Sequence, residues 1–183
     1  MLHRVFVDSD VLAARTAYDW LALLRHRTGA FQLHSSAGVV ADSVRLWAQR
    51  DPGRRAAAPR RLDLLATSLD EVIGPVAPDL DLDAAVEPRS AEADAAVARA
   101  NVLVSARGRG GATGDPLPFE IYTPDEFLCL VDDTACADVR QVTSEQRARR
   151  TRHAPASLAD ALTAAACPAF AARVGAHLDA LAR

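Results

Sequence analysis

Short apolar, strand-forming segments alternate with helical patterns along the first 133 residues. Parallel strands need long crossover connections, usually helices, so this alternation predicts a parallel α/β sheet. The remaining segments carry only helical patterns, which predicts a sheet domain over residues 1–133 and a C-terminal helical extension over 134–183. The expected strands are 4–7, 32–35, 102–104 and 120–122, and the expected helices are 11–28, 37–49, 62–72, 90–100, 137–150, 157–166 and 169–181.

Length and charge set the class of protein. The chain has 183 residues, which suits one compact domain with a small appendage. A net charge of −3 does not suit a protein that coats nucleic acid by bulk charge. The sequence contains no lysine, which excludes a catalytic lysine. An odd number of cysteines and the lack of an apolar run of about 20 residues favour a cytoplasmic protein without a membrane span.

Acidic residues follow the first predicted strand. Asp8 comes directly after the apolar segment, and Asp10 lies two residues on. Functional residues of parallel sheets collect at the carboxyl ends of strands, and Mg²⁺ prefers carboxylate oxygens. Asp8 is therefore a candidate metal ligand, whereas Asp10 is more simply a helix cap. Asp42 lies within the helix over 37–49, where the pattern alone leaves open whether it faces solvent or a site.

Four blocks of the sequence resemble the PIN-domain family. An apolar strand ends in Asp-Ser-Asp-Val-Leu, a helix carries a second acid, an Ala-Asn-Val-Leu-Val-Ser strand follows, and Thr-Pro-Asp-Glu-Phe-Leu opens a late helix. The last motif and the C-terminal helical extension resemble one bacterial subgroup of the family. The blocks lie at residues 5–12, 34–42, 100–105 and 123–128.

The resemblance implies a three-layer α/β/α fold with a short parallel sheet, and a ribonuclease that depends on Mg²⁺ or Mn²⁺. Such proteins are most often toxins of type II toxin–antitoxin pairs, of the virulence-associated protein C (VapC) type. The implied partners are RNA, a cognate antitoxin protein and a second copy of the chain. A metal ion would lower the pKa of a bound water and neutralise charge on the phosphate that is cleaved.

The resemblance also implies the acidic ligands. Asp8 matches the first acid and Asp42 the second. For the third acid, Glu87 is the nearest positional match, while Glu92 and Asp94 are alternatives. The predicted catalytic set is therefore Asp8, Asp42 and Glu87 or Asp94, with Asp8, Asp42 and Glu87 as metal ligands.

The region of the fourth acid departs from the family pattern. Residues 105–111 carry Arg107 and Arg109 where acids are expected. Arginines at a strand end can grip phosphate groups, so we expect both to contact RNA.

Two alternatives follow from the same residues. One is a PIN fold that has lost nuclease activity and binds RNA or a protein partner. The other is a phosphatase of the haloacid dehalogenase type, because Asp8 and Asp10 also resemble its nucleophile motif. That family needs a later basic residue and a pair of acids after a strand, whereas Asp132 and Asp133 follow a predicted helix.

Overall fold

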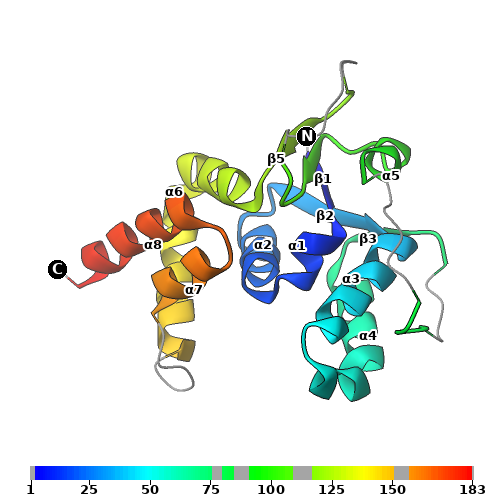
Figure 1. Ribbon diagram of the computed structural model, residues 1–183. Coiled ribbons are helices and arrows are strands. Elements are labelled where there is room, and N and C mark those ends of the chain that lie inside the picture. The colour runs from blue at the N-terminus through cyan, green and yellow to red at the C-terminus, as the bar shows by residue number, and fades with distance from the viewer. Residues whose placement is uncertain (1–2, 76–79, 85–90, 109–116, 151–156, 183) are drawn as a thin grey trace.

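The computed structural model describes residues 3–75, 80–84, 91–108, 117–150 and 157–182 (Figure 1). Glu87 and Arg109, both predicted site residues, lie outside these ranges. The described part contains one all-parallel sheet of five strands in the order β3-β2-β1-β4-β5. The strands are β1 (His3–Val7), β2 (Phe31–Ser36), β3 (Glu71–Ile73), β4 (Val102–Val104) and β5 (Glu120–Tyr122).

The parallel α/β sheet predicted from the sequence is confirmed, and the four expected strands are present. The central strands are buried over most of their length, with Val5 opposite Leu33 on one side and Val102 on the other. Strands covered on both faces have continuous apolar sequences, as Val5 to Val7 of β1 and all of β4 do. Strand β3 was missed, because the helical spacing of Leu62, Leu65 and Leu69 continues to Val72.

The prediction of a helix over 62–72 is wrong at its end. Helix α4 (Ala58–Ser68) stops where Leu69 takes an extended conformation, with φ −81° and ψ 149°. The Leu33 amide then donates to an Asp70 carboxylate oxygen at 2.8 Å, and the Asp70 amide donates to the Leu33 carbonyl at 2.8 Å. These long-range hydrogen bonds to β2 outweigh the local helical preference and start β3.

Two other helical segments differ from the expected ones. The first predicted helix is split at Ala14, with φ −85° and ψ 86°, into α1 (Ser9–Ala13) and α2 (Arg15–Thr28). Helix α2 ends at Gly29, whose φ of 59° suits glycine, as the sequence predicts. The Pro-, Gly- and Arg-rich sequence over 51–59 predicts a loop, but the segment contains the 3₁₀ helix η1 (Pro52–Ala57) and the start of α4.

Helices flank the sheet in a way compatible with three layers. Helix α1 packs against α3 (Ala37–Gln49), and α2 packs against α6 (Pro124–Arg150). Helix α5 (Ala91–Val97) contacts β2 and β4. Crossovers between parallel strands are almost always right-handed, so the reversal of direction after β3 places α5 on the opposite face from α1 to α4.

The C-terminal helices pack against the sheet domain (Figure 1). Helix α6 runs through the predicted boundary at residues 133 and 134, with a non-helical residue at Ala135. Helices α7 (Leu158–Ala164) and α8 (Pro168–Leu181) form the expected hairpin. The Phe170 ring of α8 meets the Trp20 ring of α2 edge to face at 5.1 Å, so both segments share one core. The spacing of Phe170, Val174, Leu178 and Leu181 predicts one apolar stripe on α8, but Leu181 is exposed.

The start of α6 is fixed by a capping box, which the Thr-Pro-Asp-Glu sequence at 123–126 predicts. The Thr123 amide donates to Glu126 Oε2 at 2.8 Å, and the Glu126 amide donates to Thr123 Oγ1 at 3.2 Å. The neighbouring Asp125 carboxylate accepts the amides of Ala169 and Phe170, at 3.1 and 2.8 Å. Asp125 therefore joins the start of α6 to the start of α8.

Replacing Asp125 with Ala is expected to lower the free energy of unfolding by about 2 kcal/mol, because the change leaves two amides at the start of α8 without their carboxylate. Urea unfolding followed by circular dichroism measures the change. Asp138→Ala is a suitable control, since it removes only the half-exposed ion pair with Arg27, worth below about 1 kcal/mol. Equal effects of the two substitutions would contradict this role for Asp125.

Among the described helices, none combines the length and the apolar character that a membrane span requires.

Candidate active site

The strand order creates a natural binding position between β1 and β4. The chain proceeds from β1 to β2 and β3 on one side, then returns to place β4 on the other side of β1. Open α/β sheets bind ligands at such a reversal, outside the carboxyl ends of the strands. Asp8 follows β1 and Ser105 follows β4, and the Ser105 hydroxyl donates to Asp8 Oδ2 at 2.8 Å. The predicted first acid therefore lies at the reversal point.

Asp8 is buried, with a relative exposure of 3 %, and its two oxygens have different partners. Oδ1 accepts the Ser9 amide at 2.7 Å and so caps α1. Oδ2 accepts Ser105 and lies 3.4 Å from a guanidinium nitrogen of Arg107. The cap expected at Asp10 is thus supplied by Asp8, because Asp10 already lies in the first turn of α1.

Asp10 faces the same end of β4. Its Oδ1 accepts the Ala106 amide at 3.3 Å. Burial, reinforced by the charge of Asp8, raises the pKa of the Asp10 carboxyl above its ordinary value. The folded chain therefore holds a proton at Asp10 at pH values where the unfolded chain has released it.

The raised pKa of Asp10 makes its ionised form oppose folding at neutral pH. Asp10→Asn is expected to raise the melting temperature at about pH 7. The gain should shrink as the pH falls through the folded pKa and vanish below the unfolded value of about 3.9. Thermal unfolding of both proteins across this range measures it. Lower stability of the variant at about pH 7 would contradict the assignment.

Asp42, the predicted second acid, is buried, with a relative exposure of 3 %, so the solvent-facing alternative is wrong. It lies on α3, which packs against α1, the helix that Asp8 caps. Arg45, one turn on, places a guanidinium nitrogen 2.6 Å from Asp42 Oδ1. Arg45 also donates to the Asp81 carbonyl at 2.9 Å, which holds the guanidinium in place.

Asp94, an alternative for the third acid, contacts the end of β2. Its Oδ2 accepts the Ser36 hydroxyl at 2.6 Å, and Ser36 in turn caps α3 by accepting the Val39 amide at 3.2 Å. Glu92 is half-buried on the same helix α5. Asp94 is thus a described candidate for the third acid that is hydrogen-bonded at the carboxyl end of a strand.

These carboxylates suit a hard divalent cation in chemistry and in number. Mg²⁺ commonly takes one or two protein carboxylates and keeps several waters. Asp8 and Asp42 are buried carboxylates on packed elements, which fits that donor set. In the described ranges, Asp8, Asp42 and Asp94 do not form a group of three whose ligand atoms all lie within 4.8 Å. The described acids therefore do not by themselves form a site of three carboxylates.

Arg107, predicted to contact RNA, lies at the rim of this site. Its side chain is 68 % exposed, while one nitrogen reaches Asp8 Oδ2. The guanidinium is placed to meet a phosphate group that approaches Asp8. Gly108, with a φ of 55°, follows directly and carries a turn that a larger residue would strain.

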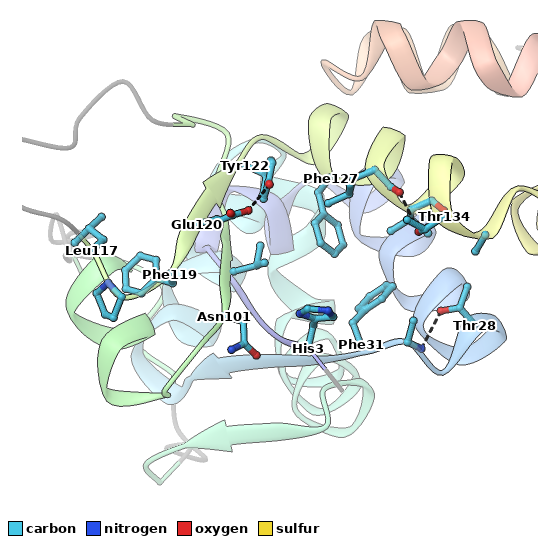
Figure 2. A pocket seen from close by; sticks show the side chains of 16 residues that line it. His3, Thr28, Phe31, Asn101, Leu117, Phe119, Glu120, Tyr122, Phe127 and Thr134 are labelled. Carbon is cyan, nitrogen blue, oxygen red and sulfur yellow. Dashed lines mark hydrogen bonds between the residues drawn. The ribbon is translucent and has the colours of Figure 1, made fainter. Parts of the chain in front are cut away.

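A separate cavity of about 590 Å³ lies at the amino ends of the strands (Figure 2). Its lining includes the first residues of four strands, and the Phe31 and Phe127 rings meet there edge to face at 5.3 Å. Of the predicted site residues, none of those within the described ranges lines it. Because amino and carboxyl ends lie at opposite edges of a parallel sheet, this cavity is distinct from the acidic site. The first residues of the four strands that line the cavity are His3, Phe31, Val102 and Glu120.

Sequence reasoning missed the side chains that hold the acids. Ser105, Ser36 and Arg45 contact Asp8, Asp94 and Asp42 respectively. Serines directly after predicted strands were the available signal for Ser36 and Ser105. Arg45 lies three residues after Asp42 on a helix, a spacing at which side chains meet.

No protein-family model, no curated protein and no solved structure matches the chain.

Proposed function

We propose that the chain is a metal-dependent endoribonuclease with a PIN-like fold, acting as the toxin of a type II toxin–antitoxin pair. The observation that carries the proposal is the buried carboxylate of Asp8 at the reversal point between β1 and β4, hydrogen-bonded to Ser105. This is the position where an α/β sheet binds its ligand. The resemblance of residues 5–12, 34–42, 100–105 and 123–128 to PIN domains supports the same assignment.

In this proposal Asp8 and Asp42 would hold Mg²⁺ or Mn²⁺, and Asp94, hydrogen-bonded to Ser36 at the end of β2, would complete the site. The ion would lower the pKa of a bound water and neutralise charge on the scissile phosphate. Arg107 binds the phosphate and Arg45 keeps the Asp42 carboxylate in a fixed orientation. Glu87 and Arg109 stay predictions, as a metal ligand and an RNA contact.

The partners belong to the same proposal. RNA is the substrate, and the exposed Arg107 beside the acids supports this. A cognate antitoxin protein and a second copy of the chain follow from the family resemblance.

The full chain, incubated with single-stranded RNA and Mn²⁺ or Mg²⁺, tests the proposal. Cleavage that EDTA stops and added metal restores is the expected result. Absence of cleavage together with RNA binding that Arg107→Ala weakens would favour the alternative of a binding protein without nuclease activity.

The phosphatase alternative has less support. Asp132 and Asp133, the acid pair that it needs, belong to α6 and contact Arg173 and His177 of α8. These contacts engage the pair with the C-terminal hairpin. A phosphatase would release phosphate from aryl phosphates, which the nuclease proposal does not expect.

A further inference from the structure

A second group of ligand-type side chains lies between α6 and α8, and it plays no part in the proposed nuclease site. Asp132 and Cys136 come from α6, and His177 comes from α8. One carboxylate oxygen, the thiol sulfur and one imidazole nitrogen all lie within 4.8 Å of one another. This is the one such group of three or more in the described ranges. From this arrangement we propose that Asp132, Cys136 and His177 bind Zn²⁺.

The donor set selects zinc over magnesium. A thiolate and an imidazole are soft or borderline ligands, which suit Zn²⁺ and are poor ligands for Mg²⁺. Zinc with bonds of about 2.0–2.3 Å to S, N and O holds its ligands roughly 3.3–3.8 Å apart. A small closure of the cluster therefore reaches this geometry. Three protein ligands leave a fourth position for water.

The charge of the cluster also matches. The Asp132 carboxylate and a Cys136 thiolate together carry two negative charges, while the imidazole is neutral. Zn²⁺ would balance these two charges, so the three ligands and the bound ion together would carry no net charge. Asp132 and His177 are each 7 % exposed, whereas Cys136 is exposed and gives the ion a path from solvent.

The surroundings orient the ligands. His177 Nε2 lies 2.7 Å from Asp132 Oδ1, and an ion would replace this hydrogen bond. The other oxygen, Oδ2, lies 3.3 Å from a nitrogen of Arg173, whose guanidinium also pairs with Asp133. Arg173 thus fixes the carboxylate from the side away from the imidazole. Such outer hydrogen bonds commonly orient metal ligands.

The backbone of α6 departs from helical geometry between its two ligands. Ala135 has φ −138° and ψ 44°. The Thr134 hydroxyl donates to the carbonyls of Leu130 and Val131, at 3.0 and 3.2 Å, and such bonds bend helices. Irregular backbone of this kind is concentrated at functional sites. Zinc at this place would join α8 to the parts of α6 on both sides of the bend.

Titration of the full chain with Zn²⁺, with Co²⁺ as a spectroscopic substitute, tests the inference. We expect one Zn²⁺ per chain, a higher melting temperature with Zn²⁺, and a thiolate-to-cobalt absorption band. Cys136→Ser should abolish the band and weaken Zn²⁺ binding by about a hundredfold or more. Because Cys136 is exposed, its replacement leaves the core intact. His177→Gln should also weaken binding.

Cys129→Ser is the matched control, since Cys129 lies on the same helix outside the cluster, and it should keep the band and the affinity. Asp8→Asn should keep both as well, which separates this inference from the nuclease proposal. Absence of Zn²⁺ binding in the natural chain, or equal binding by Cys136→Ser, would overturn it.

Discussion

Replacing Asp8 with Asn is expected to slow metal-dependent RNA cleavage by about a thousandfold. A bound metal ion stabilises the transition state by several kcal/mol, and each ~1.4 kcal/mol changes a rate tenfold. Asn keeps an oxygen for the Ser9 amide and is as good a helix cap as Asp, so α1 should persist. The loss of activity then reports the loss of a charged metal ligand, which cleavage rates at saturating Mn²⁺ measure.

Asp51→Asn is the matched control for this experiment. Asp51 caps η1 by accepting the Gly53 amide at 3.0 Å, but it lies far along the chain from the strand ends. The Asp51→Asn protein should cleave RNA at the natural rate. A folded Asp8→Asn protein that cleaves RNA within about threefold of the natural rate would exclude Asp8 as a metal ligand, since losing a ligand costs far more.

Replacing Phe170 with Ala is expected to lower the free energy of unfolding by about 3–5 kcal/mol. The Phe170 side chain is fully buried on α8 and meets Trp20 of α2 edge to face. In a chain of this length, each kcal/mol lowers the melting temperature by about 2–4 °C, so a fall of about 10 °C follows. Unfolding of the variant by heat and by urea, followed by circular dichroism and Trp fluorescence, measures the effect.

Phe170→Leu is the matched control for the loss of buried volume, because it keeps a large apolar side chain on α8. It keeps most of the buried volume and should cost below about 2 kcal/mol. A single cooperative transition in both variants would mean that residues 134–183 fold together with the sheet. Two separate transitions in Phe170→Ala, with the one for the sheet unchanged, would contradict the shared core and support an independent extension.

The sequence predicts the sheet well because a short local pattern of residues marks its central strands. Segments 4–7 and 102–104 are short, apolar and bounded by polar residues, and a strand buried on both faces requires that pattern. The capping box at Thr123 and the glycine at the end of α2 are also local signals, and the structure has both. These elements could be predicted because their causes lie within a few residues.

The features that the sequence did not predict depend on contacts between distant residues. Strand β3 exists because Asp70 and Leu33, 37 positions apart, exchange hydrogen bonds. The burial of Asp42 follows from the packing of α3 against α1, which the helical pattern alone left open. The zinc-type cluster forms only when the C-terminal hairpin folds back on α6, because its ligands are Asp132, Cys136 and the distant His177. The sequence alone did not predict this cluster.

The position of bound Mn²⁺ tests the central claim most directly. Crystals of the full chain soaked in Mn²⁺ should give an anomalous scattering peak within about 2.3 Å of an Asp8 carboxylate oxygen, with Asp42 as a direct or water-bridged ligand. The same soak of Asp8→Asn should lose this peak. A peak confined to Asp132, Cys136 and His177, or no peak at the carboxyl ends of β1 and β4, would contradict a metal-dependent nuclease site at Asp8.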